Sequence, residues 1–266
     1  MATKSDLRRW SGWLAIVVVF SIACALLSNW QFSRREEALA AMAQVAKNYD
    51  AAPVEIDDLA QLDSFNKIHQ WRPVRLEGHY LTGNAVLVRN RPLNGQPGFL
   101  ELVPFQLTDG RIIAIERGWI STASNYLAPS SYPLPSDREQ VVIARLRPAE
   151  PTLDRGAPDG QIATINISAL VKSEGIKDRI FSKLYGRVAS ESIPVSENPR
   201  PLAKPDLNEG NHLSYALQWI MFALMAIAAL YWGIKKEREA QTGKKASNSN
   251  RKAMGQADAE AEDSLS

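Results

Sequence analysis

Two apolar runs constrain this chain more than any other feature of its sequence. The first covers residues 13–27, and the second covers the 22 residues from 213 to 234; neither contains a charged residue. A helix of the second length measures about 33 Å, enough to cross a hydrocarbon core of about 30 Å. A helix buried in a soluble core would show a polar stripe, which is absent here. The sequence therefore predicts two transmembrane helices, at residues 10–32 and 212–234.

The first run has two alternative interpretations. A cleaved signal peptide would end its apolar core at small residues, but here the apolar stretch continues past Ala25 as far as Phe32. A lipoprotein would be modified at Cys24, yet position 21 holds Ser where such signals usually have Leu. We interpret Cys24 as a small apolar residue inside a membrane helix. Because it is the single cysteine, an intramolecular disulfide framework and a Cys-based metal centre are excluded.

Basic residues predict the orientation of the two helices. They cluster before the first run and after the second, at Lys4, Arg8, Arg9, Lys235, Lys236 and Arg238. Such clusters stay on the cytoplasmic side of a membrane, so residues 1–9 and 235–266 are predicted to be cytoplasmic and residues 33–211 extracytoplasmic. The tail at 235–266 has almost no large apolar residue, and we expect it to be disordered.

The central segment has the pattern of a β-rich domain. Residues 36–49 favour a helix that continues from the first span, and residues 194–211 form a Pro-rich tether. Between them lie short alternating runs at 73–80, 85–89, 99–107, 111–116 and 140–146, with weaker candidates at 162–167 and 185–192. The turn Thr108-Asp109-Gly110 predicts a hairpin. We expect one mostly antiparallel β (α+β) domain, as a sheet or a small open barrel, with a short helix at 169–172 or 177–183.

Composition and motifs exclude several classes of function. The chain has 31 Lys and Arg against 29 Asp and Glu, a net charge of +2, whereas a dedicated nucleic-acid binder needs a basic surplus. The sequence contains no phosphate-binding loop, no GxSxG elbow and no CxxC pair. An envelope enzyme with an unrecognised site therefore has no positive support.

One histidine has an unusual position. His212 immediately precedes the second span, where Asn211 can cap the helix. Several aromatic and basic residues are expected at the same membrane level or helix face: Tyr215, Trp219, Trp30, Arg34 and Arg35. An imidazole could ligate haem iron there, with aromatics against the porphyrin and arginines on its propionates. The alternative is an ordinary aromatic belt beside a helix-end histidine.

Five segments, in order, resemble motifs of the Surfeit locus protein 1 family. They are Trp30-Gln31 with Arg34; VRLEGHY at 74–80; Asn90-Arg91-Pro92 with GQPGF at 95–99, which includes Gly98; Arg117-Gly118-Trp119-Ile120; and NHLSYALQW at 211–219. The last is the closest match, to Asn-His-x-x-Tyr-Ala-x-x-Trp. Asn29 stands where the family has Gly, and Ser121 where it has Pro. The resemblance covers roughly residues 10–235.

The resemblance implies a bacterial plasma-membrane protein that is an assembly factor rather than an enzyme. Family members assist insertion of haem a into the catalytic subunit of an aa-type cytochrome c oxidase, so that subunit, and haem a synthase, are the expected partners. The resemblance makes His212 the suspected haem ligand, with Trp30, Tyr215, Trp219, Arg34 and Arg35 around the cofactor.

The remaining motif residues are assigned to the fold or to partner binding. They are Gln31, Gly98, Arg117, Gly118, Trp119 and Asn211. We interpret Arg117-Gly118-Trp119 first as supporting the fold and second as binding a partner, and Gly118 as permitting a tight turn or a close backbone approach. The alternative function for the whole chain is a permanent accessory subunit of the oxidase or of a larger respiratory complex, which would need no haem.

Overall fold

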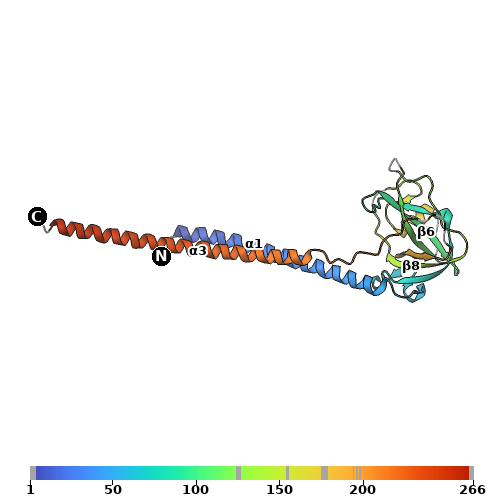
Figure 1. The fold of residues 1–266 in the computed structure, drawn as a ribbon, viewed down its shortest axis with the longest axis horizontal. Coiled ribbons are helices and arrows are strands. Elements are labelled where there is room, and N and C mark those ends of the chain that lie inside the picture. Colours follow the sequence, from blue (N-terminus) through green and yellow to red (C-terminus); the bar gives the residue numbers. More distant parts are fainter. Residues whose placement is uncertain are drawn as a thin grey trace. The chain divides into compact units, whose positions relative to one another are not determined.

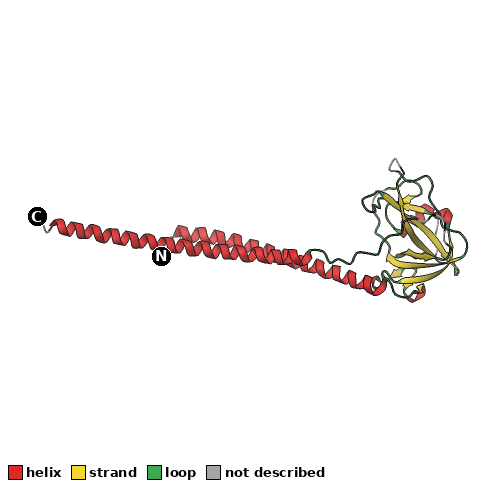
Figure 2. Ribbon diagram, in the orientation of Figure 1, coloured by secondary structure: helices red, strands yellow, loops and turns green. Residues whose placement is uncertain are grey.

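The computed structural model describes residues 4–263, apart from 124–126, 154–155, 175–178, 194, 196 and 198. The chain divides into two compact units: Met1–Leu39 with Glu209–Ser266, and Ala40–Asn208. Helices make up the first unit, and strands dominate the second (Figure 2).

Two long helices form the first unit. Helix α1 extends over Lys4–Asn48 and helix α3 over His212–Asp263 (Figure 1). Both contain stretches long and apolar enough to cross a membrane, within Arg8–Asn48 and His212–Gly243. The helix predicted at 36–49 is confirmed as the continuation of the first apolar helix, because the Ala-rich segment carries no helix breaker.

Small side chains lie where the two helices touch. Cys24, Ser28 and Ala216 are buried, and the Ser28 hydroxyl donates to the Ala216 carbonyl at 3.1 Å. Small residues let helix backbones approach closely in an apolar medium, where a hydroxyl also needs a partner. Cys24 therefore occupies the place expected of a small apolar residue. At the other end of the pair, Glu237 accepts from the Trp10 indole at 2.9 Å.

The predicted disorder of residues 235–266 differs from the structure, in which α3 remains helical to Asp263. The segment is rich in Ala, Lys, Glu and Gln, which have high helix propensity. A helix that is already nucleated by the apolar part of α3 can extend through such residues at little cost, because propagation is easier than nucleation. Low hydrophobicity excluded a packed core there, but not a helix.

The second unit contains ten described strands and three short helical turns. The strands are β1 Val54–Glu55, β2 Ala60–Gln61, β3 Ser64–Phe65, β4 Pro73–Tyr80, β5 Val86–Val88, β6 Gly98–Leu107, β7 Ile112–Ser121, β8 Gln140–Pro148, β9 Gln161–Ile162 and β10 Leu184–Glu191. The 3₁₀ turns are η1 Ile56–Asp58, η2 Lys67–His69 and η3 Thr82–Asn84, and helix α2 covers Ile167–Glu174. The strands β2 and β3 pair only with each other.

Five of the strands close into a barrel. The order β4-β8-β10-β7-β6 is completed by a second pairing between β6 and β4. Most of these pairings are antiparallel, but β10 and β7 run parallel, with Gly186 opposite Ile115. In chain order the ring reads first, second, third, fifth, fourth, which is the arrangement of a small OB-type barrel. The expected small barrel is thus present, within a mixed sheet.

Two apolar layers explain why β6 and β7 are buried along nearly their whole length. The barrel interior receives side chains from all five strands, including Leu76, Phe105, Ile113, Val142 and Leu184. Alternate residues of β6, β7 and β10 point to the other face, where β5, β9 and α2 cover Leu102, Ala114 and Tyr185. Because both faces are covered, these strands are almost continuously apolar in sequence.

Some of the predicted elements have different bounds. The weak strand candidate at 162–167 is divided between β9 and the start of α2, and α2 includes the predicted helix at 169–172. The alternative helix at 177–183 falls partly outside the described residues, and residues 179–183 are not helical. The tether is also more ordered than expected, because Arg200 pairs with Trp119.

Candidate functional site

The histidine singled out by the sequence lies at the start of α3, hydrogen bonded to α1. His212 Nδ1 is 2.9 Å from the Gln31 side-chain oxygen. An amide oxygen can only accept a hydrogen bond, so this contact assigns the ring proton to Nδ1. The Nε2 atom is then unprotonated, and its lone pair is available. Histidines that bind metals usually donate their second ring N–H to an oxygen in this way.

The Nε2 edge of the ring is bordered by a residue without a side chain. Gly210 has φ +72°, and a Cβ atom placed on it would lie 3.5 Å from both Nε2 and Cδ2 of His212. A larger residue at this position would therefore cover the edge that carries the lone pair. His212 is half-buried, with Asn211 exposed beside it. The Asn211 carbonyl accepts from the Tyr215 amide at 3.1 Å, which places Asn211 at the helix start as predicted.

The predicted aromatic residues are present on the helices but are not gathered into a closed pocket. Trp30 is 55 % exposed and Tyr215 is 51 % exposed. Trp219 is half-buried and meets Phe222 edge-to-face, with ring centroids 5.8 Å apart. Large exposed apolar side chains on such helices are suited to contact with lipid or a partner.

The two arginines at this level already have acidic partners. Arg34 pairs with Glu37 at 2.6 Å, one helical turn away, and both side chains are exposed. Arg35 pairs through Nε with Glu209 at 2.9 Å, just before α3 begins. Exposed ion pairs contribute only about 0–1 kcal/mol, so an incoming anionic group could replace either carboxylate.

The other motif residues come together in the barrel. The Trp119 indole donates to the Arg91 carbonyl at 2.6 Å, and the Arg91 amide donates to the Gly98 carbonyl at 2.9 Å. A Cβ atom on Gly98 would lie 2.4 Å from the Trp119 ring, and one on Gly118 would lie 2.7 Å from the Arg200 carbonyl oxygen. Both glycines therefore permit close packing, as predicted for Gly118. This geometry supports the interpretation of the tryptophan motif as part of the fold.

Arg117 is the centre of a buried ion network. Its guanidinium donates to Glu101 Oε2 at 2.8 Å and, through two nitrogens, to both oxygens of Glu191 at 2.9 and 3.1 Å. The Tyr80 hydroxyl also donates to Glu191, at 2.6 Å. Burial raises the pKa of Glu101 to about 7, although Arg117 favours the charged form. Burial also raises the pKa of Tyr80.

Sequence reasoning identified Arg117 but missed both carboxylates. A local signal existed for Glu101, which is the only charged residue in the apolar run from 98 to 107. Its partners lie on other strands, and Glu191 is 74 positions from Arg117. A charged residue inside a strand that is apolar on both faces requires a buried partner. The alternation of apolar and polar residues along one strand cannot identify that partner.

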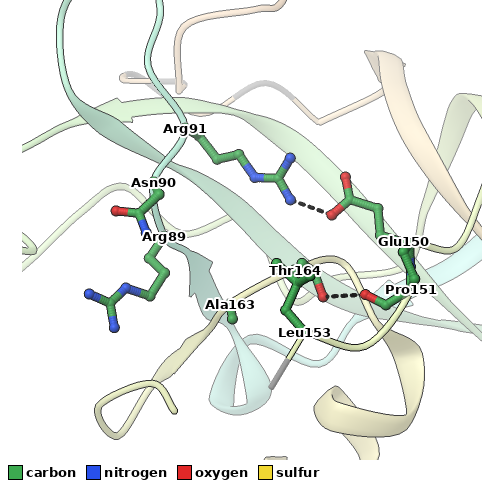
Figure 3. A pocket seen from close by; sticks show the side chains of 8 residues that line it. All are labelled: Arg89, Asn90, Arg91, Glu150, Pro151, Leu153, Ala163 and Thr164. Atoms are coloured by element: carbon green, nitrogen blue, oxygen red, sulfur yellow. Dashed lines mark hydrogen bonds and ion pairs between the residues drawn. The ribbon is translucent and has the colours of Figure 1, made fainter. Parts of the chain in front are cut away.

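A cavity of about 560 Å³ lies beside the segment that follows β5 (Figure 3). Its lining comes from three stretches of chain and consists of Arg89, Asn90, Arg91, Glu150, Pro151, Leu153, Ala163 and Thr164. Arg91 forms an ion pair with Glu150, and the Thr164 hydroxyl donates to the Pro151 carbonyl at 3.0 Å. The sequence motif predicted the turn at 90–98 but not this cavity.

Comparison with known proteins gives a consistent result. A SURF1-like protein of Mycobacterium tuberculosis is 29 % identical over 88 % of this chain and 88 % of its own length. One of Rickettsia felis is 20 % identical over 80 % of this chain and 92 % of its own.

A relative from Saccharomyces cerevisiae bears a functional name. The cytochrome oxidase assembly protein SHY1 is 28 % identical over 65 % of this chain and 46 % of its own length. The sequence model of the SURF1 family matches residues 18–224, which include part of each apolar helix and the whole barrel. The motif segments pack against one another in the barrel and pair across the two helices, in agreement with this match. The chain therefore belongs to the SURF1 family.

Proposed function

We propose that this protein is an assembly factor for an aa-type cytochrome c oxidase, and that it holds haem a during delivery to the catalytic subunit. Family membership and the name of the yeast relative support a role in oxidase assembly. This role is one of binding and release rather than catalysis. Haem a synthase is the second proposed partner, as the source of the cofactor.

The observation that carries the haem proposal is the contact between His212 and Gln31. His212 would be the residue that holds haem, which would take a histidine nitrogen as an iron ligand. The 2.9 Å contact assigns the His212 proton to Nδ1 and orients the ring, so Nε2 is the nitrogen that would bind iron. The absence of a side chain at Gly210 keeps that edge open. These features support His212 as the histidine that would bind haem iron.

The charged and aromatic residues near His212 suit the rest of a porphyrin. Arg34 and Arg35 would bind propionates by exchanging Glu37 and Glu209 for the incoming carboxylates. Trp30, Tyr215 and Trp219 would pack on the ring or on the partner subunit. Exchangeable ion pairs and exposed aromatics favour release, which a delivery factor requires as much as binding.

The exposed apolar helices support placement in a bacterial plasma membrane. Side chains such as Val19, Leu26, Leu224 and Trp232 are exposed on the helices, where lipid would cover them. We propose that the chain spans the membrane twice, with both termini in the cytoplasm and the barrel outside.

The test is the haem a content of the full chain, purified in detergent after co-production with the haem a biosynthetic enzymes. Wild-type protein is expected to carry haem a, and His212→Ala to lose most of it. Gln31→Leu is expected to reduce haem content less, because it removes the orienting acceptor but not the ligand; outer-ligand contacts typically contribute ten- to a hundredfold in affinity.

The matched control is His69→Ala, at a histidine on the 3₁₀ turn η2 in the other unit. Its haem content should equal that of the wild type. Equal haem in His212→Ala and wild type would reject His212 as the ligand. Haem in neither would reject the carrier role and favour a permanent accessory subunit, which stoichiometric presence in the mature oxidase would then identify.

A further inference from the structure

We propose that the cavity beside Arg89 and Arg91 is a binding site for a small organic anion, whose carboxylate or phosphate pairs with the two arginines. The cavity lies entirely in the barrel unit, Ala40–Asn208. It does not depend on His212 or on the helices, so this inference is independent of the haem proposal.

The charge of the lining favours an anion. Two arginines and one carboxylate line the cavity, and in Figure 3 Arg91 points toward Glu150 while Arg89 points away from that pair. Glu150 is ionised: burial alone would raise its pKa, but hydrogen bonds from Arg91 and from the Ile165 amide outweigh burial and lower it. The Arg89 guanidinium has no acidic partner among the described residues, and its hydrogen bond there goes to the Gly156 carbonyl, at 3.2 Å. Among the residues that the structure describes around the cavity, one positive charge is therefore left without an acidic partner.

Arg91 has unused donors as well. Glu150 accepts from its Nη2, while its Nε is buried without a hydrogen-bond partner. A guanidinium has five N–H groups in a planar fork that matches carboxylate and phosphate oxygens. Arg91 can therefore keep Glu150 and still bind an anionic group from the cavity side.

The backbone that carries the arginines is held rigidly. Asn90, between them, has φ +58°, a left-handed conformation that asparagine tolerates better than most residues. The Arg91 carbonyl is fixed by the Trp119 indole and its amide by Gly98. Charged groups on a fixed frame lose little entropy on binding. The motif turn at 90–98 therefore orients the cavity wall.

The remaining walls indicate the kind of anion. Pro151, Leu153 and Ala163 supply apolar surface, and Asn90 and Thr164 supply polar groups. A volume of about 560 Å³ lies within the range of small-molecule sites. An acid with an apolar body matches this lining better than a bare inorganic ion.

The test uses the full chain in detergent, titrated by calorimetry at low salt with benzoate, phenyl phosphate, inorganic phosphate and the neutral analogue benzamide. Benzoate or phenyl phosphate is expected to bind at least about tenfold more tightly than benzamide, with affinity falling as salt rises. Comparison of these two acids distinguishes a carboxylate site from a phosphate site, and inorganic phosphate tests the need for an apolar body.

Two variants should move affinity in opposite directions. Arg89→Gln is expected to weaken binding about tenfold, the effect of losing one charged hydrogen bond. Glu150→Gln is expected to tighten binding about threefold or more, because it removes the competing carboxylate while keeping an oxygen for the Ile165 amide. A folding defect cannot produce a gain in affinity.

Arg138→Gln, at an exposed arginine outside the cavity, is the control and should leave binding unchanged. The site is rejected if neither acid binds more tightly than benzamide. It is also rejected if Arg89→Gln and Arg138→Gln bind equally, since the anion would then lie elsewhere.

Discussion

At the residue scale, the buried network around Arg117 contains two carboxylates, Glu101 and Glu191, for one guanidinium. Arg117 is 3 % exposed and Glu101 is fully buried. The guanidinium bonds Glu191 through two nitrogens and Glu101 through one, while Glu101 Oε1 has no partner among the described residues. Buried charges without full compensation are costly, and the raised pKa of Glu101 expresses that cost.

The consequence for stability has a definite sign. Glu101 titrates at about 7 in the folded state and near 4.5 as a free group, so the folded state binds more protons between these values. The free energy of unfolding should therefore fall as pH rises from about 4.5 to about 7, by up to about 3 kcal/mol at about 1.4 kcal/mol per pKa unit. Denaturation midpoints at pH 5 and pH 8 measure this difference.

Glu101→Gln identifies the responsible group. It is expected to remove most of the decline, because an amide carries no charge that burial can penalise. The exposed Glu139→Gln should retain the wild-type pH dependence. A decline that persists unchanged in Glu101→Gln would reject Glu101 as its cause.

The residues of the helix site were predictable, whereas those of the cavity were not. His212 lies at the start of the second apolar run and Gln31 at the end of the first. The lengths of the two runs therefore place both residues at the same height along the helix pair, and the 2.9 Å contact between them confirms this placement. Arg89 and Glu150 are separated by 61 positions. They meet only because the barrel brings their two segments together.

At the element scale, the last turn of α1 is fastened to the barrel by stacked cations and aromatic rings. The Arg145 guanidinium lies 3.8 Å from the Tyr49 ring centroid, and Arg147 lies 4.0 Å from that of Trp71. Tyr49, Trp71 and Val45 form a small buried cluster of their own. Arg145 Nε also donates to the Tyr49 carbonyl at 2.9 Å, which satisfies a group at the helix end.

This arrangement predicts that Arg145→Lys is not a conservative change. Lysine keeps the charge but has no planar group to stack and no Nε donor. We expect a loss of about 1–2 kcal/mol in unfolding free energy, with faster amide hydrogen exchange at residues 45–49. The exposed Arg75→Lys on β4 is the control and should leave both quantities unchanged. Equal protection in the two variants would contradict the role of stacking.

Element positions followed from local patterns, but their pairing did not. The alternation at 73–80 located β4 at its observed bounds, and the turn at 108–110 located the β6–β7 hairpin, with Gly110 at φ +82°. No local pattern indicates that β10 lies parallel to β7, because that pairing joins residues about 70 positions apart. Two-residue strands such as β1 are too short to show an alternation of apolar and polar residues.

At the scale of the whole molecule, the two apolar helices predict where each segment lies relative to the membrane. In a Cys24→Ala background, Ser130→Cys places a thiol on an exposed loop of the barrel unit, and Gly243→Cys places one at an exposed position of α3. A membrane-impermeant maleimide applied to spheroplasts should label position 130 fully. It should label position 243 only after lysis, because the flanking basic residues stay in the cytoplasm.

The reverse labelling pattern would show the opposite orientation. Labelling of both positions in intact spheroplasts would show that the two ends of α3's apolar stretch lie on one side, which excludes a spanning helix. The unsubstituted Cys24→Ala chain, which has no thiol, provides the background.

The position of β10 in the barrel has a consequence for biosynthesis. It is the last strand of the chain, yet it lies between β8 and β7, so it completes the ring. A ribosome releases the chain from its N-terminus, and until residue 191 emerges both β7 and β8 carry an open edge. Open edges invite pairing with other chains. The nascent protein is therefore expected to be most prone to aggregation just before residue 191 emerges, and all the barrel strands are synthesised before α3.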